Sequence, residues 1–140
     1  MTPQQIDLVQ SSFAKVAPIA DAAAAMFYAR LFEIAPRVMP LFHGDMTEQG
    51  RKLMMTLGVV VNGLKDLEAI VPAAQALAVK HVRYGVKAAD YAMVGEALLW
   101  TLQQGLGAAY TAEVAAAWTT AYETLSGVMI AAAYGEEAAA

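Results

Sequence analysis

The sequence predicts an all-α fold. Apolar residues recur at three- and four-residue spacing along most of the 140 residues, which is typical of one face of an amphipathic helix. Alanine is abundant and favours helix throughout, and no segment shows the alternation of a strand bounded by turns. Because 59% of the residues are hydrophobic, a chain of this length can bury a sizeable core. We expect one domain over residues 1–135 and a frayed tail over 136–140.

Proline, glycine and capping residues place the elements in order. Thr2 can cap the first helix, because Pro3 suits its first position and Gln5 completes a capping box. Asp21 is expected to cap a second helix that runs to about Ile34. The remaining elements are expected as a short helical turn over 36–42, a loop over 43–45, a helix over about 46–65, a helix that Pro72 opens and that ends before Gly85, and helices over about 90–106 and 111–133.

Composition narrows the class of function. The net charge of -4 and the absence of a basic patch argue against nucleic acid as the main partner. The absence of cysteine excludes disulfides, thiolate metal sites and covalent attachment of haem through Cys-x-x-Cys-His. The first residues do not resemble a secretory signal, and the uncharged run over 97–112 is too short to cross a bilayer. We therefore expect a cytoplasmic protein that does not associate with membranes.

Three polar side chains interrupt apolar helix faces. His81 is one of two histidines and has aliphatic neighbours, and its ring must find a partner if it is buried. Gln49 begins a stripe that Leu53 continues, a pattern that fits either an exposed first turn or a polar group aimed into a pocket. Tyr28 lies on a broad aromatic face, where its hydroxyl also needs a partner. On these residues alone, a histidine satisfied within the core remains the simplest interpretation.

The ordered set of these residues resembles the globin family. It is most similar to the single-domain bacterial haemoglobins of the flavohaemoglobin lineage, and the resemblance covers essentially the whole chain. The residues that carry it are Phe27-Tyr28, Pro40-Leu41-Phe42, Gln49 with Leu53, His81, Tyr84-Gly85-Val86, Asp90-Tyr91 with Val94-Gly95 and Leu98-Leu99, and Ala117-Trp118 with Tyr122.

The resemblance implies a three-over-three helical sandwich around one non-covalent haem b. His81 would bind the iron through Nε2, while a backbone carbonyl near Leu77 takes the Nδ1 proton. Tyr28 and Gln49 would donate to a distal gas ligand such as dioxygen, NO or CO. The full set of implied cofactor contacts is His81, Phe42, Leu53, Leu77, Val86, Tyr91 and Val94, and the implied distal contacts are Tyr28, Gln49 and Leu53.

Four further residues near this set have two interpretations each. Lys52, Lys80 and Arg83 suit either the haem propionates or ordinary solvated charge. His43 follows Phe42 in a predicted loop, where it is either exposed or an alternative distal iron ligand.

Two departures from the lineage bear on function. The sequence leaves no room for a flavin- and nicotinamide-binding reductase module, so sustained turnover would need a separate reductase. The lineage usually has a glutamate near the proximal imidazole, together with a tyrosine that Tyr91 matches, but the corresponding position here is Ala133. Glu136 and Glu137 lie a turn further on and are expected to miss the imidazole. A less anionic imidazole favours reversible ligand binding over oxygen cleavage.

The leading hypothesis is therefore a haem protein that binds dioxygen reversibly for transport, storage or scavenging. An alternative is an enzyme, a nitric oxide dioxygenase that uses an external reductase. Two other hypotheses remain. One is a gas sensor that acts through a partner, and the other is a helical bundle without haem.

Overall fold

The predicted all-α class is confirmed. The computed structural model describes residues 1–42, 44–83 and 85–139, and it describes the backbone alone at residue 83 and over 134–139. Within these residues there are six α-helices and no strand. The helices are α1 (Pro3–Val16), α2 (Ala20–Ile34), α3 (Met46–Asn62), α4 (Leu67–Arg83), α5 (Asp90–Leu106) and α6 (Ala112–Ala139), and four 3-10 turns connect them, η1 (Ala17–Ile19), η2 (Pro36–Leu41), η3 (Leu64–Asp66) and η4 (Gly107–Ala109).

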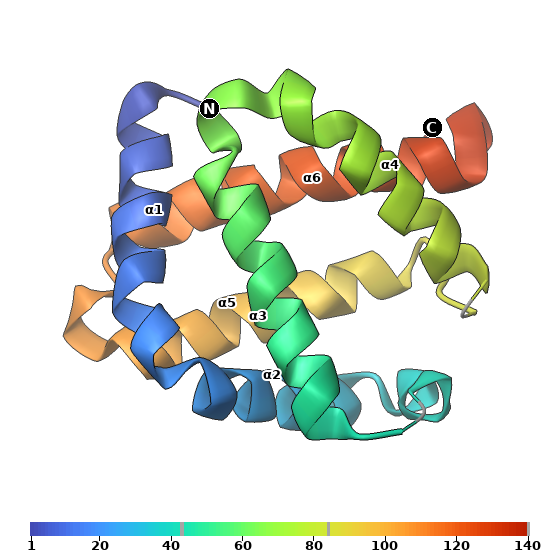
Figure 1. Cartoon of the computed structure of the whole chain (residues 1–140), viewed down its shortest axis with the longest axis horizontal. Helices are drawn as coiled ribbons and strands as arrows, with labels where there is room; N and C mark the ends of the chain where they lie inside the picture. The colour runs from blue at the N-terminus through green and yellow to red at the C-terminus, as the bar shows by residue number, and fades with distance from the viewer. Residues whose placement is uncertain (43, 84, 140) are drawn as a thin grey trace.

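The helices form two layers of three. In Figure 1, α1, α3 and α4 lie in front, and α2, α5 and α6 lie behind them. The strongest contacts between the layers join α4 and α1 to α6, and α3 to α2, while α2 also packs along α5 within its own layer. The two layers therefore pack face to face, as the predicted sandwich requires, and α2 and α5 also pack side by side in one layer.

Two apolar clusters form the core. The larger one contains residues of α1, α2, α5 and α6, including Val9, Leu31, Leu102 and Trp118. Trp118 is 2% exposed, and its indole N–H donates to the Ser12 hydroxyl over 2.8 Å, so the buried donor is satisfied. The smaller cluster joins α4, α5 and α6 around Ala74, Ala78, Tyr91 and Met129. The division matters because the candidate site residues fall on both clusters.

The predicted start of α1 is confirmed, but that of α2 is wrong. Thr2 accepts from Gln5 N–H, and the Gln5 side chain accepts from Thr2 N–H, which completes the capping box. Asp21 does not cap α2, because the chain passes from α1 through η1 directly into a helix that begins at Ala20. Asp21 lies instead in the first turn, where its carboxylate is still favourably placed near the positive end of the helix dipole.

The middle helices also differ from the prediction. The long helix ends at Asn62, because Gly63 closes it and η3 follows. Pro72 does not open the next helix but lies inside α4, which begins at Leu67. Pro72 has no N–H to donate to the carbonyl four residues earlier, and Figure 1 shows α4 bending along its course.

The last helix begins close to its expected position and extends further. The Thr111 hydroxyl accepts from Val114 N–H at its start, and α6 runs to Ala139 instead of ending near Ala133. The division into a domain over 1–135 and a frayed tail over 136–140 stays a prediction. Among the described residues, no helix is both long enough and apolar enough to cross a membrane.

Glycine allows close contact between α5 and α6, and its substitution should destabilise the fold. A Cβ at Gly95 would lie 2.6 Å from Tyr122 Cε2. The Tyr122 hydroxyl donates to Tyr91 O over 2.5 Å, so the ring cannot move without weakening that bond. We expect Gly95→Ala to lower the free energy of unfolding by about 1–3 kcal/mol, as overpacking does. Urea unfolding measures this change.

Gly127 supplies the matched control for that experiment. It lies on α6, and nothing stands within 4 Å of a Cβ added to it. Gly127→Ala should therefore leave stability unchanged or raise it by up to about 1 kcal/mol, because alanine is the better helix former. Equal stability of the two variants would contradict the close approach at Gly95.

Candidate haem site

Tyr28 lies at the centre of an aromatic group formed by α2 and the segment after η2. Its side chain is 7% exposed. Its ring stacks on Phe32 with centroids 6.0 Å apart and meets Phe42 edge-on at 5.2 Å. Phe32 and Phe42 also meet each other at 5.4 Å, so the three rings fix one another. The phenol is therefore held by packing on a rigid helix.

The pKa of the Tyr28 hydroxyl is shifted by its surroundings. Burial raises the pKa of the phenol above its ordinary value of 10.0, and a side-chain hydrogen bond with Gln49 opposes this shift by a smaller amount. Because the pKa rises, the phenol keeps its proton at neutral pH and remains a hydrogen-bond donor. Gln49 is part-buried in the first turn of α3, so the pocket interpretation of this residue fits better than an exposed one.

Leu53 lies one turn beyond Gln49 on α3 and packs against the larger cluster. With Phe27 and Leu98 it lines a void of about 20 Å³ between α1, α2, α3 and α5. Tyr28 contacts Phe42, and Gln49 and Leu53 lie one turn apart on α3; we call these four residues the distal wall. Val94 of α5 packs against the same cluster.

His81 lies near the end of α4 and is partly buried. Its Nδ1 is 2.8 Å from Leu77 O, one turn earlier on the same helix. A carbonyl oxygen can only accept, so Nδ1 must carry the proton, and in the neutral ring the lone pair resides on Nε2. This is the tautomer that binds a metal through Nε2, with its orientation set by the helix backbone.

The smaller cluster surrounds the other implied contacts. Leu77 and Val86 pack against this cluster, which includes Tyr91, a residue that is 6% exposed. Ala133 of α6 packs against the same cluster, and its correspondence to the lineage's glutamate stays a prediction. We call this second group, with His81, the proximal wall. A methyl group at position 133 cannot accept a proton from an imidazole.

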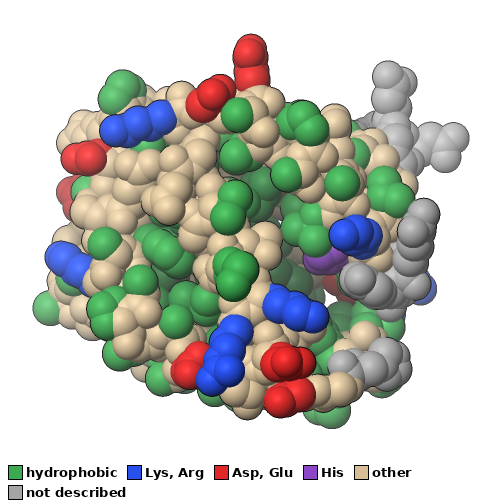
Figure 2. Space-filling model, in the orientation of Figure 1, with side chains coloured by type: hydrophobic (Ala, Val, Ile, Leu, Met, Phe, Trp, Pro, Cys, Tyr) green, Lys and Arg blue, Asp and Glu red, His purple; other side chains and the backbone are tan. Residues whose placement is uncertain are grey.

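The two walls fit a flat apolar group with a metal at its centre. One wall offers a protonated phenol and an amide, and the other offers an imidazole whose lone pair is on Nε2. Figure 2 shows this face of the molecule hollowed, with hydrophobic side chains lining the hollow and a histidine side chain at its edge. Aromatic and aliphatic surface suits a porphyrin, and the sparse polar groups suit its metal and a small ligand.

Several predicted residues are not brought into either wall. Lys52 and Lys80 are exposed, so their role at the propionates stays a prediction. The side chains of Arg83, Glu136 and Glu137 lie outside the described residues, as does His43. The two interpretations of His43 and the expectation that the glutamates miss the imidazole both stay predictions.

Sequence reasoning missed two polar contacts beside the site. Arg37 of η2 forms a bidentate ion pair with Asp90, the first residue of α5. Tyr122 donates to the backbone of Tyr91, and burial raises its pKa above the ordinary range. Both contacts join residues far apart in sequence, so no local spacing could have indicated them.

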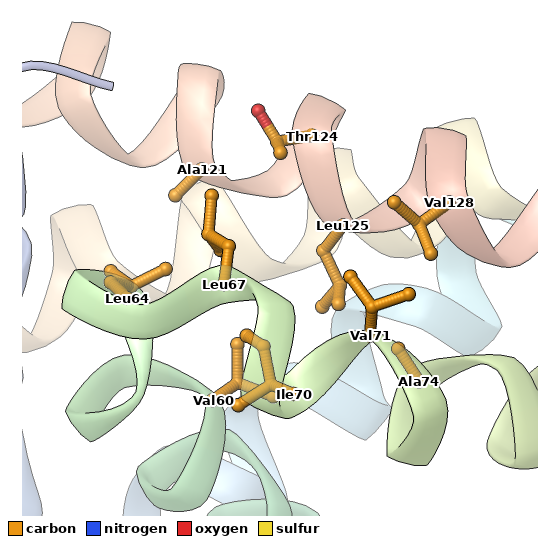
Figure 3. Close-up of a pocket in the computed structure, with 10 residues that line it drawn as sticks. All are labelled: Val60, Leu64, Leu67, Ile70, Val71, Ala74, Ala121, Thr124, Leu125 and Val128. Carbon is orange, nitrogen blue, oxygen red and sulfur yellow. The ribbon is translucent and has the colours of Figure 1, made fainter.

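A separate apolar cavity of about 80 Å³ lies beyond the site, between the end of α3, η3, the start of α4 and α6. Figure 3 shows its lining, and the Thr124 hydroxyl points away from the other side chains. That hydroxyl donates to Thr120 O within its own helix. The cavity therefore offers no group that would orient a polar ligand. Its lining residues are Val60, Leu64, Leu67, Ile70, Val71, Ala74, Ala121, Thr124, Leu125 and Val128.

A helical sandwich with an imidazole on one wall and a phenol on the other belongs to the class of all-α haem proteins. The sequence profile of the globin family matches residues 25–129. The chain is 34% identical to a neuroglobin of Tetraodon nigroviridis, over 71% of this chain and 72% of that protein. It is 31% identical to a flavohemoprotein of Halalkalibacterium halodurans, over 88% of this chain and 31% of that protein.

A solved structure agrees with these sequence relatives. An engineered carbene transferase from Rhodothermus marinus, named as a candidate nitric oxide dioxygenase, superposes with a TM-score of 0.82 at 27% identity. The match covers 92% of this chain and 90% of that one. The chain therefore belongs to the globin family, whose members bind haem and diatomic gases. It spans about a third of the flavohemoprotein that it matches.

Proposed function

We propose that this globin holds one haem b between its two walls and binds dioxygen reversibly, for transport, storage or scavenging. The observation that carries the proposal is the buried Tyr28 phenol, which packs against Phe32 and Phe42. Haem, when bound, supplies an iron with an open position for a diatomic ligand. The proposed contacts are His81 at the metal, and Phe42, Leu53, Leu77, Val86, Tyr91 and Val94 around the ring.

The distal residues would select dioxygen by hydrogen bonding. Tyr28 and Gln49 would donate hydrogen bonds to a dioxygen ligand, which would accept them strongly, whereas carbon monoxide would accept them only weakly. Tyr28 is fixed by its ring contacts with Phe32 and Phe42, so it donates without first being ordered. Leu53 closes the wall without offering a donor and so excludes water.

The proximal residues would favour binding over oxygen cleavage. The Nδ1–H of His81 donates to Leu77 O, which fixes the ring orientation and would make Nε2 the metal ligand. The proposed counterpart of the lineage's glutamate is Ala133, so no carboxylate from that position would draw the proton away and make the ring more electron-donating. The proposed iron ligand is thus comparatively neutral.

Absorption spectroscopy tests this proposal directly. The purified protein, loaded with haem, should give a Soret band, a five-coordinate ferrous spectrum and an oxygenated spectrum that reverses under argon. Absence of a Soret band after reconstitution would support the bundle without haem. A six-coordinate ferrous spectrum without added ligand would point instead to a second internal ligand such as His43.

A second function is nitric oxide dioxygenation with a separate reductase. The flavohemoprotein relatives and the naming of the Rhodothermus marinus structure favour it, as does the Tyr28–Gln49 pair on the distal wall. Stopped-flow mixing of the oxygenated protein with nitric oxide and a reductase distinguishes the two. Many turnovers would establish the enzyme, whereas a halt after one turnover with every reductase tried would leave reversible binding. A gas-sensing role predicts a partner protein that is captured in a pull-down only when the gas ligand is bound, or only when it is absent.

A further inference from the structure

Arg37 and Asp90 join two segments that lie 53 residues apart. Arg37 Nε donates to Asp90 Oδ1 over 3.0 Å, and Arg37 Nη2 donates to Asp90 Oδ2. The Asp90 side chain is 8% exposed, whereas that of Arg37 is 46% exposed. A guanidinium that donates to both carboxylate oxygens fixes the relative orientation of the two segments as well as the distance between them.

The same carboxylate organises the corner between α4 and α5. Lys87 N–H donates to Asp90 Oδ2 over 2.8 Å, which closes the turn before α5. On the other side of that turn, Val86 N–H donates to His81 O over 3.0 Å. The position of Asp90 is therefore linked through the corner to the backbone of His81.

A second contact joins the same two segments. A Cβ built on Gly85 would lie 3.0 Å from Leu41 Cδ2, and Gly85 has a φ of +95°, which side chains rarely adopt. Leu41 directly precedes Phe42 on the distal wall, and Gly85 directly precedes Val86 on the proximal wall. The ion pair and this contact hold the two walls together at one end.

We propose that Arg37 and Asp90 form a latch between η2 and the α4–α5 corner that retains haem between the walls. The latch rests on the proposed function, because it gives the pair a role only if a group occupies the space between the walls. Haem escapes when the walls separate, and separation here must break a bidentate pair. Without Arg37, the buried carboxylate would keep only a backbone donor, which favours opening the corner to water. Both are positioning residues, since neither is proposed to touch the ring.

Haem transfer to an excess of an apoglobin acceptor tests the latch. Arg37→Met should lose haem at least about tenfold faster than the parent protein, a factor that corresponds to about 1.4 kcal/mol. Arg51→Met is the matched control, because Arg51 forms a long, exposed pair with Asp21 at 3.7 Å. The control should transfer haem at the parent rate. Equal rates for the two variants would overturn the latch.

Two further variants separate positioning from general stability. Trp118→Phe removes the buried hydrogen bond to Ser12, away from the corner, and should lower global stability without speeding haem transfer to the same extent. Arg37→Lys keeps the positive charge but loses the two parallel hydrogen bonds to the Asp90 carboxylate. Its rate of haem transfer should therefore fall between those of the parent and Arg37→Met. If Arg37→Met does not fold, Arg37→Lys becomes the test variant. A rate of haem transfer equal to that of the parent would then overturn the latch.

Amide hydrogen exchange in the haem-free protein provides a readout that does not depend on the cofactor. Arg37→Met should speed exchange at Val86 and Lys87 while leaving the amides of α1 unchanged. Failure of the proposed function would appear differently, as a parent protein that takes up no haem. In that case unchanged exchange at the corner would also overturn the latch, and faster exchange would support its structural basis.

Discussion

His81→Ala should abolish stable haem binding. The variant removes the imidazole whose Nε2 is the proposed metal ligand, and the affinity for haem should fall at least about a hundredfold, or by roughly 3 kcal/mol. Titration with haem, followed at the Soret band, measures this loss. Exogenous imidazole should restore a ligated spectrum, because the substitution leaves space where the ring stood.

The fold itself should tolerate that substitution. His81 Nδ1 bonds Leu77 O within the same helix, and alanine is the best helix former. Far-ultraviolet circular dichroism of the haem-free variant should therefore match that of the parent. His43→Ala is the control at the second histidine, and it should keep a parent-like spectrum. A ferrous spectrum that is unchanged by His81→Ala would show that the proximal assignment is wrong.

The fold was predictable because periodicity and capping are local. The capping box at Thr2 and the helix over Asp90–Leu106 are confirmed, since each depends on residues within a few positions. The expectations for Asp21 and Pro72 were wrong because each residue type commonly starts a helix, whereas α2 begins at Ala20 and α4 begins at Leu67. Local sequence signals therefore predict which helices form more accurately than they predict where each helix begins and ends.

The candidate site was predictable only in part, for a related reason. Tyr28, Gln49 and His81 could be singled out because a polar group on an apolar face needs a partner. The partner of His81, Leu77 O, lies one turn back on the same helix and was expected from the sequence, whereas the rings that hold Tyr28 come together only in the fold. Arg37 and Asp90 gave no such signal, because charged residues near helix ends are ordinarily solvated.

Tyr28→Phe should speed dioxygen dissociation by roughly tenfold to a hundredfold, the factor that a hydrogen bond to a charged acceptor supplies. Carbon monoxide dissociation should change little, because that ligand accepts only weakly. Laser photolysis and ligand replacement measure both rates. The raised pKa of Tyr28 adds a pH prediction. The donor is lost only as the pH rises through the folded-state pKa, so the dissociation rate of the parent should be flat from about pH 6 to pH 9.

Gln49→Leu and the double variant Tyr28→Phe/Gln49→Leu measure how much each of the two distal residues contributes to holding dioxygen. If Tyr28 and Gln49 act as one hydrogen-bonded unit, the double variant should dissociate dioxygen less rapidly than the product of the single effects predicts. Tyr110→Phe is the matched control, because it removes a phenol beside η4 that belongs to neither wall. If Tyr28→Phe leaves the dissociation rate at the parent value while Gln49→Leu raises it, the amide is the donor and the phenol only positions it. If neither variant changes the rate, the distal pair does not hold the ligand, and selection of dioxygen must rest on the proximal side.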